Sequence, residues 1–187
     1  MASDASSGEQ PSPIIDFYLA TSPNAEGRRI EEIWDWDDSR LEGVHNFIQW
    51  LFPLRTRSAF NARSPILSES EIERFRESKL LQQRLARSLD TMLRFYGLQL
   101  RRTPEGDPVV EKRPAFASRR VAWLNPHNHN HLRLTRILTS TAMLGLHREA
   151  LALQRCLVDL AHEYPEAITQ DTLRFWEDAI PSTIEQP

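Results

Sequence analysis

The sequence predicts an all-α fold: a single compact domain of about seven helices with one long irregular connection. Apolar residues recur at three- and four-residue spacing over most of the chain, which is the period of an amphipathic helix. No segment alternates apolar and polar residues over the length of a strand. With 187 residues, 40% of them hydrophobic, the chain can bury one sizeable core. We therefore expect one helical domain over residues 13–181, between a disordered tail at 1–12 and a flexible C-terminus at 182–187.

The domain is expected to begin with a short helix over residues 14–19. After a turn at residues 21–27, a short apolar face at Ile30, Ile33 and Trp34 precedes the next helix. Asp37 or Asp38 can cap this second helix, because an aspartate side chain accepts hydrogen bonds from the free N–H groups of a first turn. The second helix must end by Phe52, since the proline after it disfavours helical geometry at the preceding residue.

This second helix is expected to have a buried stripe and a separate polar face. Its apolar side chains recur at helical spacing, as they do where a helix packs on a core. Three polar side chains lie three and four residues apart, so a continuous helix places them together on another face. The stripe consists of Leu41, Val44, Ile48 and Leu51, and the polar face of Glu42, His45 and Gln49.

The second half of the domain contains clear helix boundaries. Residues 68–71 have the spacing of a capping box, and a longer helix over residues 78–96 is stopped by Gly97. Residues 103–108 are rich in turn-forming types. Residues 114–126 have no clean period, so we expect an ordered but irregular connection there, of the kind that often carries function. Three further helices are expected over residues 128–144, 148–162 and 170–180.

Two blocks of the sequence resemble the conserved N-terminal domain of the opioid growth factor receptor family. In residues 37–53 an acidic pair leads into Leu-Glu, a histidine and Ile-Gln-Trp-Leu-Phe-Pro. The second block is residues 129–138, closed by residues 144–146, and shorter matches lie between the two in the expected order. The resemblance implies a short, stand-alone member of the family without the receptor's repeat tail. It also implies a receptor-like role, because the family's namesake ligand is a short enkephalin peptide.

Residues 126–131 contain three of the six histidines, and three interpretations of them stay open. Imidazole can ligate a metal, move a proton or bind an anion near neutral pH. In the first interpretation Asn128 or Asn130 caps the helix and the histidines only lock elements together by hydrogen bonds. In the second the chain is a metal-dependent enzyme with a zinc or iron site. The ligands of that site would be His129, His131, His45 and Glu42.

The third interpretation is a metal-free pocket, and the function that we expect rests on it. The chain would be a soluble, receptor-like binding module for a small peptide or an anionic small molecule. Arg133 and Arg136 lie three residues apart, and guanidinium groups bind carboxylate or phosphate. Trp50 would pack against an apolar group of the ligand. The pocket would consist of Trp50, Glu42, His45, Gln49, His129, Asn130, His131, Arg133 and Arg136.

Other classes of protein find less support in the sequence. It has no nucleophile elbow, phosphate-binding loop or dinucleotide fingerprint, so no catalytic residue is expected. Residues 101–136 are basic, but the net charge is −3 and no nucleic-acid-binding motif is present, so nucleic acid is not expected as a partner. No apolar run is long enough to insert into a membrane. A single cysteine fits a reducing compartment, so we expect a cytoplasmic protein, and only the family resemblance implies nuclear or membrane association.

Overall fold

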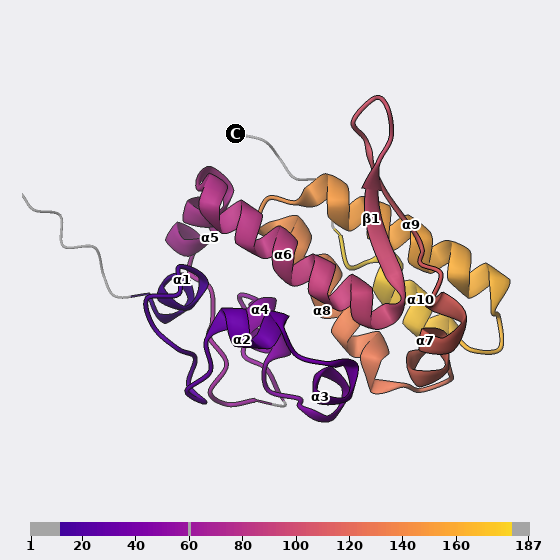
Figure 1. Cartoon of the computed structure of the whole chain (residues 1–187), viewed down its shortest axis with the longest axis horizontal. Helices are drawn as coiled ribbons and strands as arrows, with labels where there is room; N and C mark the ends of the chain where they lie inside the picture. Colours follow the sequence, from indigo (N-terminus) through magenta and orange to yellow (C-terminus); the bar gives the residue numbers. More distant parts are fainter. Residues whose placement is uncertain (1–11, 60, 181–187) are drawn as a thin grey trace, which may run out of the picture.

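The computed structural model describes residues 12–59 and 61–180, which form ten helices and one two-stranded antiparallel sheet (Figure 1). The prediction of an all-α domain with about seven helices is therefore wrong. The expected tail and flexible C-terminus lie outside the described residues, apart from Ser12, whose hydroxyl caps the first helix. Among the described helices, none combines the length and the apolar composition needed to cross a bilayer.

The sheet is a hairpin of β1 (Leu98–Arg102) and β2 (Pro108–Lys112), in which Leu98 lies opposite Lys112. It projects from the helices at the end of the longest one (Figure 1). Val110 is buried and Val109 is 42% exposed, as expected for neighbours on opposite faces of a strand. The prediction missed the hairpin because two adjacent arginines in β1 and two adjacent valines in β2 hide the alternation of apolar and polar residues.

The N-terminal part consists of four short helices that lie along one side of the longest helix (Figure 1). Asp37 caps the third of them by accepting a hydrogen bond from the main-chain N–H of Arg40 at 2.7 Å, which confirms one of the two capping candidates. The four helices are α1 (Pro13–Tyr18), α2 (Ile30–Trp34), α3 (Asp38–Gly43) and α4 (Ile48–Leu51).

The helix predicted from Asp37 to Phe52 is instead split into α3 and α4. Val44 is extended, with φ −95° and ψ 130°, and ends α3. The main-chain carbonyls of Leu41 and Val44 accept hydrogen bonds from the guanidinium of Arg133, at 2.9 Å each. Because a distant side chain satisfies these carbonyls, the helix can end there without unpaired acceptors.

Apart from the hairpin, the C-terminal part follows the predicted boundaries closely except at one point. The capping box of Ser68 and Glu71 is present, and the longest helix ends at Gly97 in the left-handed conformation, with φ 76°. The connection expected to be irregular contains a helix, α7, which begins at Phe116. The helices are α5 (Glu69–Glu77), α6 (Lys79–Tyr96), α7 (Phe116–Trp123), α8 (His129–Met143), α9 (His147–Glu163) and α10 (Gln170–Glu177).

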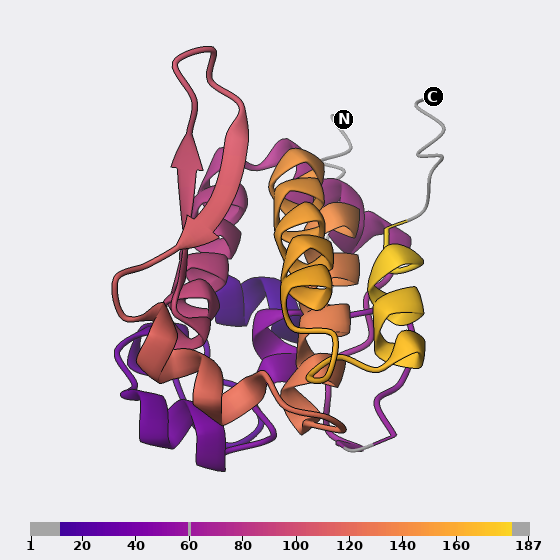
Figure 2. The same cartoon turned by 90° about the vertical axis from the view of Figure 1, so that its right-hand side faces the viewer.

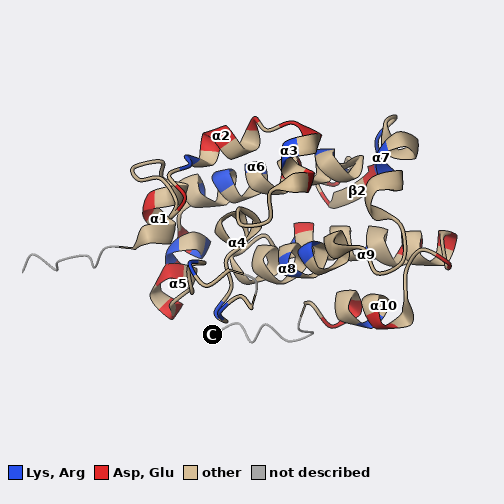
Figure 3. Ribbon diagram, turned by 90° about the horizontal axis from the view of Figure 1, so that it is seen from below, with Lys and Arg blue, Asp and Glu red and all other residues tan. Residues whose placement is uncertain are grey.

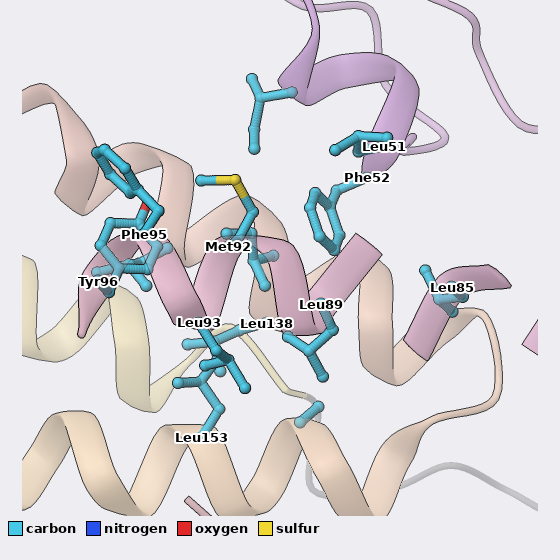
Figure 4. Packing of buried hydrophobic residues seen from close by; sticks show 14 of the residues in the cluster. Leu51, Phe52, Leu85, Leu89, Met92, Leu93, Phe95, Tyr96, Leu138 and Leu153 are labelled. Atoms are coloured by element: carbon cyan, nitrogen blue, oxygen red, sulfur yellow. The ribbon is translucent and has the colours of Figure 1, made fainter. Parts of the chain in front are cut away.

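The core forms around α6. Met92 and Leu93 of this helix are buried between Phe52 on one side and Leu138 and Leu153 on the other (Figure 4). Helices α8, α9 and α10 pack on one another, and α8 contacts α6, with α10 on the side away from α6 (Figure 2). Apolar burial of this extent is the main stabilising contribution to such a fold. It also fixes α8 against α4, where the candidate site lies.

Candidate functional site

A pocket with a volume of about 380 Å³ lies between α4, α8 and the segment that follows α4. In Figure 3 the basic residues of α8 lie beside α4. Several lining side chains are cationic or can become so, and no aspartate or glutamate among the described residues lines the pocket. The lining residues are His45, Ile48, Gln49, Leu54, Ser58, His129, Leu132, Arg133, Thr135, Arg136 and Thr139.

Arg133 is the most heavily hydrogen-bonded residue of the pocket. Only 5% of it is exposed. Besides the carbonyls of Leu41 and Val44, its guanidinium donates to the side-chain oxygen of Asn130 at 3.2 Å and to Nδ1 of His45 at 3.1 Å. Burial lowers the pKa of Arg133. Since its N–H groups are largely used within the protein, Arg133 holds the end of α3 on α8 and leaves little donor capacity for a ligand.

His45 and His129 form a pair at the edge of the pocket. Their rings make an edge contact with centroids 5.1 Å apart. Nε2 of His129 lies 3.4 Å from the carboxylate of Glu42, whose other oxygen accepts from Nδ2 of Asn130 at 3.0 Å. Burial lowers the pKa of His129, and the charge of Arg133 lowers it further, against the opposing effect of Glu42. Glu42 and Asn130 therefore orient His129 from behind the pocket, although neither lines it.

The side chains of Arg136 and Gln49 make few hydrogen bonds to the residues that the structure describes. The guanidinium of Arg136 donates to the carbonyl of Phe52 at 3.1 Å, and it makes no ion pair with the residues that the structure describes. Burial lowers its pKa. Gln49 is 4% exposed, and its side-chain oxygen has no hydrogen-bond partner within the described part of the chain. A cationic donor and a free acceptor thus lie in the same pocket.

Two predicted residues lie elsewhere. His131 is buried, with Nε2 3.0 Å from the carbonyl of Trp123 and its ring against Trp176. Burial lowers the pKa of His131. Trp50 lines a second pocket on the other side of α4 and does not line the pocket between α4 and α8. The apolar surface that Trp50 was expected to supply comes from other side chains, namely Ile48, Leu54 and Leu132.

Sequence reasoning missed several residues of the pocket, although a signal for some of them exists. Leu132 and Thr139 lie three and ten residues after His129, so they share one face of α8 with the two arginines. Leu54 and Ser58 come from a segment without regular structure, and no sequence pattern indicated their position.

The capping interpretation of the histidine segment is supported in part. The side chain of Asn128 accepts from the main-chain N–H of Asn130 at 2.9 Å and caps α8. Of the proposed metal ligands in this segment, only His129 lies beside His45 and Glu42. His131 is separate from them, and its Nε2 is hydrogen-bonded to a main-chain carbonyl. Within residues 12–59 and 61–180, no group of three or more His, Cys, Asp or Glu side chains is arranged to hold a metal ion.

Comparison with known proteins gives the family. The conserved region of the opioid growth factor receptor matches residues 10–186. The chain belongs to the opioid growth factor receptor family. It is 36% identical over 177 residues to the opioid growth factor receptor of Mus musculus, covering 89% of this chain, and 39% identical over 140 residues to that of Homo sapiens, covering 72%. It is 38% identical over 135 residues to the opioid growth factor receptor-like protein 1 of Xenopus tropicalis, covering 70%.

The opioid growth factor receptor family members in this comparison are much longer proteins. The matched region covers 26% of the mouse receptor, 20% of the human receptor and 25% of the frog receptor-like protein. No solved structure matches the chain. The two blocks that resemble the family, residues 37–53 and 129–138, both lie within the matched region. The pocket between α4 and α8 is therefore built from residues that the family model covers.

Proposed function

We propose that this chain is a receptor-like binding module, and that the pocket between α4 and α8 binds an anionic ligand with an apolar body. The C-terminal end of a short peptide has this chemistry. Relatives of the chain are named as receptors for an opioid growth factor, which supports a ligand-binding role rather than catalysis. The observation that carries the proposal is that the guanidinium of Arg136 has no acidic partner among the described residues.

Arg136 is half-buried, yet within the described part of the chain its guanidinium makes a single hydrogen bond, to the carbonyl of Phe52. Removing a charge from water costs free energy unless an opposite charge or several hydrogen bonds replace the lost hydration. A carboxylate can accept two parallel hydrogen bonds from a guanidinium. An anion bound here would therefore interact with a cation that the described residues leave without an acidic partner.

The other walls of the pocket suit the rest of a peptide end. Ile48 and Leu132 offer an apolar surface for a side chain. The side-chain amide of Gln49 has a buried oxygen without a partner among the described residues, so a hydrogen bond from an amide N–H of the ligand would offset the cost of burying it. A peptide's last residue carries a carboxylate, an amide N–H and a side chain within a few ångströms of one another. Arg133, whose N–H groups are used within the protein, positions His45 rather than binding the ligand.

The test is calorimetric titration with a pentapeptide that has a free C-terminal carboxylate and an aromatic last residue, beside the same peptide amidated at its C-terminus. We expect the free carboxylate to bind and the amide to bind at least tenfold more weakly. Arg136→Gln should weaken binding of the free peptide to the level of the amide. Arg155→Gln changes an exposed arginine of α9 and is the matched control. Equal binding of both peptides, or full binding by Arg136→Gln, would contradict the proposal.

The metal-dependent enzyme remains the alternative, and it predicts a different result. It requires His129, His45 and Glu42 to release their present contacts with one another and ligate zinc or iron. Elemental analysis of the purified protein, beside His129→Gln, tests it. Metal at one equivalent that is lost in the variant would replace the binding proposal with an enzyme. Absence of metal from an active, peptide-binding preparation would remove this alternative.

A further inference from the structure

The pocket that Trp50 lines is a second cavity, separate from the pocket between α4 and α8. Its volume is about 470 Å³, and it lies between the start of α1, the turn at residues 23–25, α4 and the segment at residues 63–66. Its walls are largely apolar and contain three proline rings, of Pro13, Pro23 and Pro65. The proposed binding of an anion to Arg136 does not involve this cavity, because the two pockets share no lining residue.

Two residues that line this cavity each have a buried N–H group without a hydrogen-bond partner in the described part of the chain. These groups are Nε1 of Trp50 and Nδ2 of Asn24, and each residue is 4% exposed. The orientation of the Asn24 amide is fixed by its own contacts. Its side-chain oxygen accepts from the main-chain N–H groups of Glu26 at 3.1 Å and Arg28 at 2.9 Å, so its nitrogen must be the free group. Both unpaired groups are therefore donors.

The other polar side chains that line the cavity also lack an unpaired acceptor. Arg63 has only donors on its side chain, and this side chain makes no ion pair with any described residue. Glu71 is the one lining residue with a carboxylate, and its oxygens already accept hydrogen bonds from Ser12 and Ser68. The cavity thus offers unpaired donors and apolar rings but no unpaired acceptor on these side chains.

We propose that this cavity is a binding site for an extended, proline-rich peptide segment, whose main-chain carbonyls accept hydrogen bonds from Trp50 and Asn24. Proline has a carbonyl acceptor but no main-chain N–H, so a proline-rich segment presents acceptors without donors. In the polyproline conformation its carbonyls are not used internally and remain free to accept. Proline rings also pack well on aromatic and proline-lined walls. Because both nitrogen atoms are buried, a small movement of the cavity wall accompanies binding.

The experiment is an NMR titration of the ¹⁵N-labelled protein with hexaproline, acetylated and amidated so that it has no charge for Arg136. The protein has five tryptophans, and Trp50→Phe assigns the indole signal of Trp50. We expect that signal to move and saturate as peptide is added. We also expect Asn24→Asp to weaken binding roughly tenfold, since it keeps the oxygen that Glu26 and Arg28 need and replaces the free donor with an acceptor.

The matched control is Trp36→Phe, which removes another buried indole N–H without a partner, at a position that does not line the cavity. Hexaproline should bind this variant and Arg136→Gln as it binds the unchanged protein. The Arg136 variant also separates the two proposals, because it affects only the anionic peptide. An unmoved Trp50 signal at the highest peptide concentration, or full affinity in a folded Asn24→Asp, would overturn the inference. The second result does not depend on whether Trp50→Phe folds.

Discussion

Arg133 donates a hydrogen bond from Nη2 to Nδ1 of His45 over 3.1 Å. An arginine side chain has no acceptor, so the ring nitrogen must accept and the proton of His45 lies on Nε2. The same guanidinium holds the carbonyls of Leu41 and Val44 at the end of α3. One side chain of α8 therefore fixes both the break between α3 and α4 and the orientation of a histidine that lines the pocket.

Replacing Arg133 by lysine should lower the free energy of unfolding by about 2–4 kcal/mol. The planar guanidinium reaches several acceptors at once, whereas an ammonium group has one centre and would leave buried carbonyls of α3 unpaired. Urea unfolding followed by circular dichroism measures the change. Arg155→Lys on the exposed face of α9 should change stability by less than about 0.5 kcal/mol. If Arg133→Lys lowers the free energy of unfolding no more than Arg155→Lys does, Arg133 does not hold the end of α3 as described.

Stability should fall as pH decreases from 7.5 to 5.5, in part because of His131. Its folded pKa is lowered from 6.5, chiefly by burial, so between these two values the unfolded chain binds protons that the folded chain does not. Acid therefore favours unfolding as pH falls through 6.5. His131→Gln, whose amide can still donate to the carbonyl of Trp123, should flatten this dependence in urea unfolding. His162→Gln, at an exposed position of α9, should leave the slope unchanged.

Gly97→Ala should destabilise the protein by about 2–4 kcal/mol. Gly97 has φ +76°, and an added Cβ would lie 2.9 Å from Cα of Phe116 and from Cβ of Arg119. Gly106 is the matched control, because it has φ +87° but nothing within 4 Å of an added Cβ. Its alanine variant should lose only the backbone contribution, about 1 kcal/mol. Equal losses at the two positions in thermal unfolding would show that the close packing of α7 on the end of α6 contributes little.

The thiol of Cys156 should react slowly with a disulfide reagent at pH 8. Burial raises its pKa to about 11, so the reactive thiolate is a small fraction of the population. We expect labelling of the native protein to be on the order of a hundredfold slower than labelling in guanidinium chloride. Absorbance of the released thiolate follows both reactions. Comparable rates in the two conditions would show that Cys156 is accessible and activated.

Much of the local structure could be predicted from the sequence because its causes are local. The oxygen of Asp37 caps α3, Ser68 and Glu71 form a capping box, and Gly97 ends α6, each through contacts within a few residues. The residues of α8 that face the pocket were also found in part, since His129, Arg133 and Arg136 follow helical spacing. The hairpin was missed because neighbouring residues of the same kind, Arg101 and Arg102 in β1 and Val109 and Val110 in β2, interrupt the alternation that identifies a strand.

The sequence by itself determined the family, most helix boundaries and the cationic character of the α8 face. Only the tertiary structure decided which of these groups share a cavity. The helix predicted around His45 is broken by hydrogen bonds from Arg133, almost ninety residues away, and consecutive residues of α4, Gln49 and Trp50, line different pockets as a result of packing on both sides. Local pattern cannot reveal either outcome, because both depend on contacts between segments that only the folded core brings together.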